Sequence, residues 1–154
     1  MENNKYLEVR AIENGTVIDH IPSSSLFKVI KLLNLENAEN QITFGMNLNS
    51  KRLNKKAIIK ISDMYCADKE ISYLALVAPM ARINIIRDYE VVGKRQIEAP
   101  QEVDGLVRCA NPMCITNHEP VITHFTVSER NGELALRCRY CEKITSQEQI
   151  EIIR

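Results

Sequence analysis

The sequence predicts an α+β protein built from two parts. Strand-like and helix-like segments alternate over the first hundred residues, and the helical ones are too few and too short to cover both faces of a sheet. The last fifty residues are strand-rich and contain four of the five cysteines. A chain of 154 residues that is 45% hydrophobic can bury one ordinary core or two small ones.

Two strands and a helix are predicted at the start of the first part. Residues 6–12 alternate apolar and polar side chains, and the strand-like residues 16–21 follow Asn14-Gly15, a dipeptide typical of hairpin turns. A run of serines then provides a helix start. Apolar residues at helical spacing predict an amphipathic helix over 25–34.

The same strand-strand-helix sequence is predicted a second time. Residues 41–48 and 56–62 are strand-like and are joined by a basic loop. Asp68 can cap a second helix, which Pro79 ends, and residues 82–96 form a long β-rich stretch with one interruption. This order favours a mixed or antiparallel sheet with two helices on one face, a ferredoxin-like α/β sandwich.

The domain boundary is predicted just after residue 98. Residues 1–98 form the first domain, and the polar, proline-containing segment 99–104 is the predicted linker. In the second domain, residues 105–154, the strand-like segments 121–128 and 133–139 flank a hairpin turn. A core of about fifty residues is only marginally stable without further support.

Four cysteines are arranged as two close pairs in this small domain. Cys109 and Cys114 flank four residues, Cys138 and Cys141 flank two, and the hairpin between the pairs folds them together. Four thiolates around a tetrahedral d¹⁰ ion make a closed structural zinc site. The pattern therefore predicts one structural Zn²⁺ per chain in a β-rich, zinc-ribbon-like domain. Such an ion contributes on the order of 10 kcal/mol to folding.

Other interpretations of these residues remain open from the sequence. Iron in a rubredoxin-like site fits the same spacing, because spacing does not distinguish the two metals. His118 or His124 could replace a thiol, but four cysteines already complete the shell. A redox Cys-x-x-Cys would leave the other pair unexplained. Cys66 is interpreted as a packed thiol without a role.

The charge distribution disfavours nucleic acid as a partner. Twenty basic and twenty acidic residues cancel over the chain, and residues 101–154 contain six basic and eight acidic side chains. Four thiolates and one Zn²⁺ take this module to a net charge of about −4, whereas surfaces that follow phosphates are positive. A protein-docking role is therefore favoured. The docking groups could be supplied at the second cysteine pair by Arg137, Arg139, Tyr140, Glu142 and Lys143, and a solvated strand edge explains the same residues.

We expect no membrane partner and a cytoplasmic location. No apolar run reaches the ~18 residues of a membrane span, and the first residues have neither the basic nor the apolar region of a secretory signal. Five cysteines, an odd number, also argue against a disulfide framework.

Two lysines and one aspartate in the first domain could bind a nucleotide. Lys60 lies in an otherwise apolar strand and Lys94 follows Gly93 at the end of another. Ammonium groups suit phosphates, and the Asp19 carboxylate suits ribose hydroxyls. Solvated lysines explain the same pattern. The sequence has no Ser/His/Asp arrangement, paired-carboxylate motif or glycine-rich phosphate loop, so we expect no enzymatic activity of its own.

Three motifs together resemble the regulatory chain of aspartate carbamoyltransferase. They are Gly-Thr-Val-Ile-Asp-His-Ile-Pro at 15–22, Tyr-Glu-Val-Val-Gly-Lys at 89–94, and the Cys-x4-Cys…Cys-x2-Cys end. The resemblance extends over essentially the whole chain and implies a non-catalytic subunit of a pyrimidine-biosynthetic complex. Its first domain would bind CTP or ATP at one shared site, and its zinc domain would dock on the catalytic chain. Regulatory chains would pair as homodimers that bridge catalytic trimers in a heterododecamer.

The resemblance also assigns roles to single residues. Lys94 would contact the triphosphate, Asp19 the ribose, and Lys60 the ribose and base. Backbone groups of Ala11 and Ile12 would bind the exocyclic amine that cytosine and adenine share. The rest of the effector site would be Val9, Val17, His20, Lys56, Asn84, Ile86, Tyr89 and Val91, and the zinc loop would contact the catalytic chain through Asn111.

A few positions depart from the family pattern. The best-known members have an acidic residue where this chain has Arg10, so base preference or effector ranking can differ. Their lysine for a second pyrimidine nucleotide corresponds to Tyr6, with Lys5 one place earlier, which leaves UTP synergy open. Met113 replaces a polar residue of the zinc loop.

Overall fold

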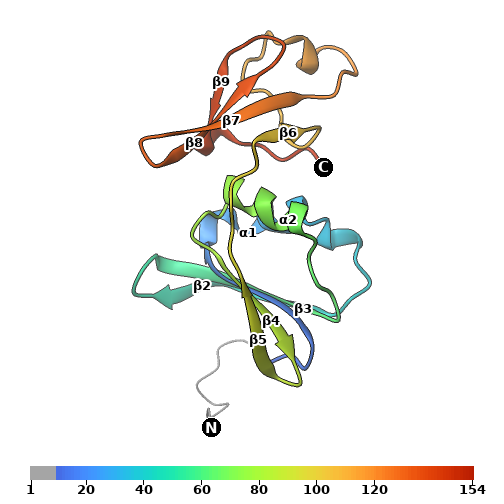
Figure 1. Ribbon diagram of the computed structural model, residues 1–154, viewed down its shortest axis with the longest axis vertical. Coiled ribbons are helices and arrows are strands. Elements are labelled where there is room, and N and C mark those ends of the chain that lie inside the picture. Colours follow the sequence, from blue (N-terminus) through green and yellow to red (C-terminus); the bar gives the residue numbers. More distant parts are fainter. Residues whose placement is uncertain (1–9) are drawn as a thin grey trace.

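The computed structural model describes residues 10–154 and contains two antiparallel sheets (Figure 1). The larger has five strands in the order β2-β3-β1-β4-β5, and the smaller has four in the order β6-β7-β8-β9. Two helices lie on one side of the larger sheet, between it and the smaller one. The α+β class predicted from the sequence is confirmed.

The elements of the first domain follow the order β-α-β-β-α-β-β. Short 3₁₀ turns flank the two helices: η2 (Ser23–Ser25) precedes α1, η3 (Leu35–Asn37) follows it, and η4 (Leu74–Leu76) continues α2. The strands and helices are β1 (Gly15–Pro22), α1 (Leu26–Leu32), β2 (Ile42–Ser50), β3 (Asn54–Ser62), α2 (Asp68–Tyr73), β4 (Arg82–Arg87) and β5 (Glu90–Arg95).

Without β5, this is the ferredoxin-like arrangement. The chain runs β-α-β-β-α-β, the four strands stand in the order β2-β3-β1-β4, and all pairings are antiparallel. Ile18, Ile59 and Ile83 lie side by side on the face that packs against the helices and are essentially inaccessible to solvent. Because side chains alternate along a strand, their neighbours point to the opposite face, which no helix of residues 10–154 covers (Figure 1).

The strand predicted at residues 6–12 is corrected by the structure. Residues 6–9 lie outside the described residues, and residues 10–12 are not in a strand. Gly15 already pairs with Ser62 of β3 and Ile86 of β4. With a neighbour on each side, β1 has no free edge beside it, so the alternating pattern before Asn14-Gly15 does not form a hairpin with it.

The predicted β-rich stretch over 82–96 is a hairpin rather than one strand. Asp88 and Tyr89 connect β4 to β5, and both have positive φ, 51° and 65°. A two-residue connection of this kind matches the twist of antiparallel strands. The interruption seen in the sequence is therefore the turn itself.

The second domain begins with a strand inside the segment predicted as a linker. Residues 102–104 form β6, which pairs with β7. The short 3₁₀ turns η5 (Ile115–Asn117) and η6 (Gln147–Gln149) complete the domain. Its strands are β6 (Glu102–Asp104), β7 (His124–Arg130), β8 (Glu133–Cys138) and β9 (Ile144–Ser146).

Two side chains of the second domain bind helix ends of the first. Gln147 Nε2 donates to the carbonyl oxygens of Ala75 and Leu76, at 3.1 and 3.3 Å. Arg154 Nη1 donates to the carbonyl oxygen of Leu32, at 2.9 Å. The last carbonyls of a helix lack partners within the helix, so both contacts satisfy groups that the helices leave open.

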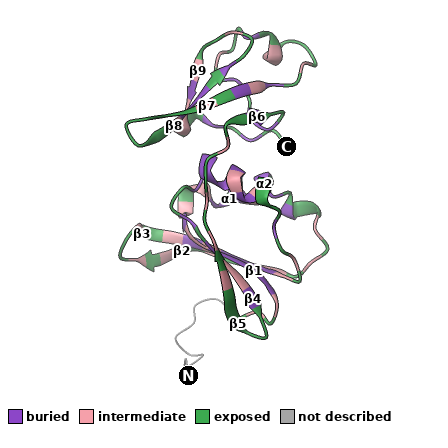
Figure 2. Ribbon diagram, in the orientation of Figure 1, coloured by how far each residue is buried: buried purple, intermediate pink, exposed green. Residues whose placement is uncertain are grey.

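Buried residues form one group that extends through both domains (Figure 2). In the second domain, Phe125, Leu136 and Ile150 are at most 2% exposed. Within residues 10–154, no helix has the length and apolar character needed to cross a membrane.

Candidate nucleotide site and metal centre

One row of side chains crosses all five strands on the open face of the larger sheet. From one edge to the other, it consists of Thr43, Lys60, Val17, Asn84 and Lys94, each opposite the next in the strand register. Directly opposed residues of antiparallel strands share a face and lie within contact distance. Antiparallel pairing thus brings together four predicted effector-site residues that are far apart in the sequence.

A bulge in β1 positions an acidic group beside this row. The β1–β3 register shifts between Ile18 and Ile21, and His20 has a φ of 60°. Asp19 Oδ1 accepts from the backbone N–H of His20 at 2.6 Å and lies 3.0 Å from Lys56 Nζ. Across the sheet, Asp19 is opposite Arg82. Three predicted residues, Asp19, His20 and Lys56, therefore lie close together.

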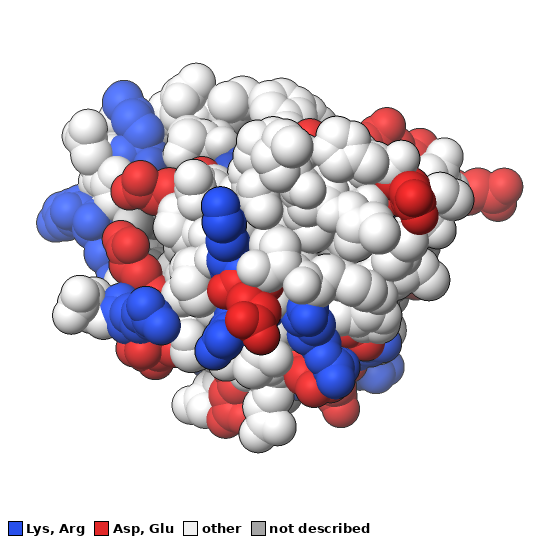
Figure 3. Space-filling view, turned by 90° about the horizontal axis from the view of Figure 1, so that it is seen from above, with Lys and Arg blue, Asp and Glu red and all other residues white. Residues whose placement is uncertain are grey.

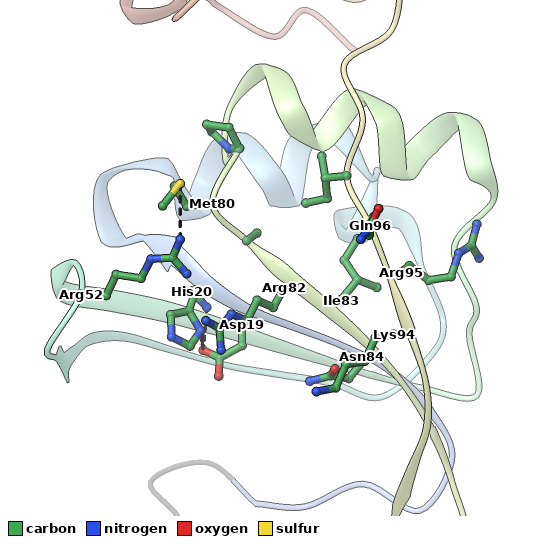
Figure 4. A pocket seen from close by; sticks show the side chains of 13 residues that line it. Asp19, His20, Arg52, Met80, Arg82, Ile83, Asn84, Lys94, Arg95 and Gln96 are labelled. Atoms are coloured by element: carbon green, nitrogen blue, oxygen red, sulfur yellow. Dashed lines mark hydrogen bonds and ion pairs between the residues drawn. The ribbon is translucent and has the colours of Figure 1, made fainter. Parts of the chain in front are cut away.

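A cavity of about 570 Å³ opens at this end of the sheet (Figure 4). Four predicted residues line it, and so do three arginines that the sequence analysis did not single out, Arg52, Arg82 and Arg95. Two features of the sequence could have identified Arg52 and Arg82 as cavity residues. Arg52 belongs to the basic loop before Lys56, and Arg82 alternates with Asn84 along one strand. Its lining consists of Asp19, His20, Arg52, Pro79, Met80, Ala81, Arg82, Ile83, Asn84, Lys94, Arg95, Gln96 and Ile97.

His20 is a neutral polar group in this cavity at pH 7. Burial lowers the pKa of its imidazole below 6.5, and the nearby charges of Lys56, Arg82 and Arg52 act in the same direction, against Asp19. Its Nδ1 is buried and has no hydrogen-bond partner among residues 10–154. This nitrogen therefore lacks the hydrogen-bond partner that buried polar groups usually have.

A second hollow of about 320 Å³ holds other predicted residues. Ala11, Ile12 and Tyr89 line it, and so does Arg10. The predicted residues Ile86 and Val91 are register partners on β4 and β5, and Val91 is exposed. Val9 lies outside the described residues. The remaining lining residues are Glu13, Asn14, Gln41, Thr43, Ser62 and Asp63.

The four paired cysteines converge on one point in the second domain. All four sulfurs lie within 4.8 Å of one another, and Cys109–Cys141 and Cys114–Cys138 have Sγ–Sγ distances of 3.7 Å. A tetrahedron with Zn–S bonds of about 2.3 Å has edges of about 3.8 Å. The arrangement therefore fits a tetrahedral zinc ion. Four bound thiolates leave no position for water, so the ion would be structural.

Hydrogen bonds from neighbouring residues hold the cysteine loops in place. Asn117 Nδ2 donates to the carbonyl oxygens of Cys109 and Asn111, at 3.0 and 2.8 Å, and Thr116 Oγ1 donates to Cys114 Sγ at 3.2 Å. Burial raises the pKa of Cys109 to about 12 and also raises that of Cys138. Without an ion these thiols hold their protons, so a cation is needed to make them thiolates.

The predicted docking residues surround the cysteine loops. Asn111 Oδ1 accepts from the backbone N–H of Met113, at 3.1 Å. Tyr140 is 45% exposed, with its ring 6.0 Å from that of His124. Glu142 and Lys143 are exposed, and Glu142 lies 3.8 Å from Arg137.

Exposed apolar side chains on the second domain were not predicted as docking groups. Met113, Ile115 and Ile122 are 79%, 46% and 63% exposed. The end of the molecule seen in Figure 3 has a broad uncharged area with acidic and basic side chains around it.

In a comparison with known proteins, two family models match successive parts of the chain. Family models described as the allosteric domain and the metal binding domain of the aspartate carbamoyltransferase regulatory chain match residues 7–98 and 101–151. Over 152 residues, the sequence is 51% identical to the aspartate carbamoyltransferase regulatory chain of Phocaeicola vulgatus, covering 99% of this chain and 97% of that one. The Vibrio vulnificus regulatory chain is 44% identical over 148 residues, or 96% and 97% of the two chains.

The resemblance inferred from the sequence motifs is confirmed. Both domain types, the absence of a catalytic role and the structural zinc follow from the matched families and the cysteine cluster. This chain belongs to the aspartate carbamoyltransferase regulatory chain family and is a non-catalytic subunit with an allosteric and a zinc-binding domain.

Proposed function

We propose that the allosteric domain binds CTP and ATP in competition on the open face of its sheet, and that the zinc domain transmits the effect to the catalytic chain. The observation that carries this proposal is the row through Lys60, Asn84 and Lys94, with Asp19 beside it and the cavity of about 570 Å³ at the same end of the sheet. Basic side chains, a carboxylate and a nearby hollow are the groups that a nucleotide requires.

Each part of the nucleotide has a candidate partner in this arrangement. The triphosphate lies against Lys94, and the ribose hydroxyls donate to the carboxylate of Asp19, which lies 3.0 Å from Lys56 Nζ. Lys60, 8% exposed, contacts ribose and base. The base reaches the second hollow, where backbone groups of Ala11 and Ile12 accept from its amino group. CTP and ATP share that amino group, so one site serves both.

Calorimetric titration of the zinc-loaded chain with CTP, and then with ATP, tests this proposal. We expect saturable and mutually exclusive binding that Lys94→Ala weakens strongly, since the variant loses a charge-assisted contact to phosphate. Lys31→Ala, on the helix side of the sheet, is the matched control and should bind as the wild type does. A folded, zinc-replete chain that binds neither nucleotide would refute the proposal.

The base preference depends on a residue in the second hollow. Arg10 lines that hollow beside Ala11 and Ile12, where the best-known relatives have an acidic residue. A guanidinium favours acceptor atoms of the base over amino groups. We therefore expect Arg10→Glu to shift binding toward nucleotides with an amino group. Tyr6 and Lys5, which bear on a second UTP, lie outside the described residues.

For the homodimer, we propose an interface along β2. This edge strand exposes Phe44 and Met46, and Phe44 contacts Phe27 edge-to-face, with ring centroids 6.5 Å apart. An exposed apolar edge is a template for pairing with another strand. Phe44→Glu should give monomers in analytical ultracentrifugation, whereas Val92→Glu, on the opposite edge strand β5, should not. A dimeric Phe44→Glu chain would contradict this interface.

The catalytic chain is the partner implied by the family, and we propose that the zinc domain binds it in a heterododecamer. The exposed groups around the cysteine loops, Asn111, Tyr140, Glu142 and Lys143, supply polar contacts beside the apolar Met113 and Ile115. Four reduced, metal-binding thiols fit the cytoplasm as the location of this complex. To test assembly, the wild-type chain and variants with single substitutions at these four polar positions are mixed with catalytic trimers and analysed by gel filtration.

An effector changes catalysis only through different affinities for two quaternary states. In our proposal, the nucleotide favours one state of the holoenzyme without touching a catalytic site. The contacts of Gln147 and Arg154 with the helix ends connect the nucleotide domain to the docking domain. Effector-independent kinetics in a reconstituted holoenzyme that still binds CTP would show that this connection fails.

A further inference from the structure

We propose that Asn117 is a positioning residue of the first cysteine loop, defined here as residues 109–117. Its amide holds this loop in the shape in which zinc is retained and Asn111 is presented to the catalytic chain. Asn117 is neither a zinc ligand nor one of the predicted docking residues. The docking part of this inference rests on the proposed contact between Asn111 and the catalytic chain, whereas the zinc part does not.

A single side-chain amide closes the first cysteine loop. Asn117 Nδ2 donates to the carbonyl oxygens of Cys109 and Asn111, at 3.0 and 2.8 Å. Asn117 is itself held in place, because its backbone N–H donates to the carbonyl oxygen of Cys114 at 2.9 Å. The side chain therefore connects the two ends of a segment that contains both cysteines of the first pair.

The backbone carbonyl of Cys109 depends on this amide. Cys109 is 2% exposed, so water has little access to its backbone. Among residues 10–154, Asn117 is the only hydrogen-bond donor to this carbonyl oxygen. Because buried carbonyls are almost always paired, loss of the amide favours a rearrangement of the loop. That rearrangement would occur at a residue that binds zinc.

The same amide fixes Asn111. The Asn111 carbonyl oxygen accepts from Asn117 Nδ2 and, at 3.0 Å, from the backbone N–H of Cys114. Burial alone would raise the pKa of the Cys141 thiol, but hydrogen bonds, first among them one from the Asn111 side chain, lower it to about 7. Asn111 therefore contacts both cysteine pairs. A displacement of the loop changes the metal site and this docking group together.

The first test measures zinc affinity of the full chain by competition with a chelator. Replacement of a residue that holds metal ligands typically lowers metal affinity about 10- to 100-fold. We expect a loss in this range for Asn117→Asp, which keeps the size of the side chain but turns the donor into an acceptor facing two carbonyl oxygens. Asn117→Ala removes the donor without adding a charge and should give a loss in the same direction.

The matched control is Asn131→Asp. It adds the same charge to the same domain, in the exposed turn between β7 and β8, where the Asn131 side chain forms no hydrogen bond with the described part of the chain. The absorption bands of the cobalt-substituted chain report the geometry of the four thiolates. We expect these bands to change in Asn117→Asp and to stay as in the wild type in Asn131→Asp.

The second test measures association with catalytic trimers at saturating zinc, so that every chain is loaded with metal. We expect Asn117→Asp to weaken association roughly ten-fold, the effect of losing about one well-formed hydrogen bond. In a chain that already carries Asn111→Ala, the same substitution should change association less than about two-fold. A residue that acts through another has little effect of its own once that other side chain is removed.

Circular dichroism and zinc content establish that each variant is folded. Zinc affinity of the Asn117 variants within about two-fold of the wild type, or an equal loss in Asn131→Asp, would overturn the inference. Additive effects of Asn111→Ala and Asn117→Asp on association would overturn its docking part. If the folded, zinc-loaded wild type does not bind catalytic trimers, the proposed function is refuted, and the zinc measurement still decides whether Asn117 positions the metal loop.

Discussion

Gln147→Glu should uncouple the two domains without preventing nucleotide binding or assembly. The wild-type side chain makes three hydrogen bonds: its amide nitrogen donates to the carbonyls of Ala75 and Leu76, and its oxygen accepts from the backbone N–H of Leu134 at 2.9 Å. A glutamate of the same size keeps the bond to Leu134 within the zinc domain. It replaces the donor with an acceptor that faces two carbonyl oxygens.

The expected loss follows from these contacts. Each hydrogen bond between domains contributes about 1 kcal/mol, and a carboxylate near a helix C-terminus costs about 0.3–1 kcal/mol. The substitution therefore weakens the domain interface by about 2–3 kcal/mol. Allosteric coupling free energies are typically about 1–3 kcal/mol. A loss of this size is large enough to remove most of the effector response.

The assay is the dependence of aspartate carbamoyltransferase activity on CTP and ATP in reconstituted holoenzyme, with calorimetry of CTP on the same preparation. We expect CTP affinity and assembly close to the wild type and an effector response reduced several-fold. Gln149→Glu in the same 3₁₀ turn is the matched control, because within the described part of the chain the Gln149 side chain bonds only to Ser146, at the start of that turn. An unchanged effector response in Gln147→Glu would refute transmission through this contact.

Three further outcomes are expected. Chelation of zinc, or Cys138→Ser, removes binding free energy on the order of 10 kcal/mol and should release the regulatory chain from active catalytic trimers in gel filtration; an intact, effector-sensitive complex would contradict this. Gly15→Ala places a Cβ in a severe clash with the carbonyl oxygen of Ile61 at a φ of +139° and should cost about 3 kcal/mol or more in urea unfolding; a cost below about 1 kcal/mol would contradict this clash. Burial lowers the pKa of His20 below 6.5, so the unfolded chain binds more protons and stability should fall as the pH drops through 6.5. In His20→Gln, the free energy of unfolding measured from about pH 8 to about pH 5 should lack the part of this fall that His20 causes. Parallel curves for the wild type and the variant would show that His20 is not its cause.

Local patterns predicted most of the fold, because helices and strands leave a period in the sequence. Apolar spacing located α1 and α2, and alternation located β2 and β3 to within a few residues. The failure at residues 10–12 has a different origin. Alternation shows that a segment can form a strand, but not whether a neighbouring strand is free to pair. The two neighbours of β1 are β3 and β4, which come much later in the chain.

The metal centre was predictable because its ligands come in two sequence-local pairs. The nucleotide site has no such signature: Lys60, Asn84 and Lys94 are brought together only by the register of four strands. The strand pattern offered Lys60 and Lys94 as possible nucleotide ligands with solvated lysines as the alternative, whereas only family resemblance suggested Asn84. Neither the sequence pattern nor the family resemblance pointed to Arg52 or Gln147. Their contacts, with the Met80 sulfur and with the carbonyls of a helix end, form only when the chain folds.

The arrangement of the larger sheet, the two helices and the zinc domain in successive layers gives a short route by which a nucleotide on the sheet could affect the zinc domain. Strands β1 and β4 carry candidate ligands, Val17 and Asn84, on one face and the core residues Ile18 and Ile83 on the other. A nucleotide that shifts these strands therefore displaces side chains packed against the helices, since a close-packed interior accommodates little change. Gln147 and Arg154 hold the ends of those helices from the zinc-domain side (Figure 1). The signal then needs to cross only one sheet and one helical layer to reach the domain that we propose binds the catalytic chain.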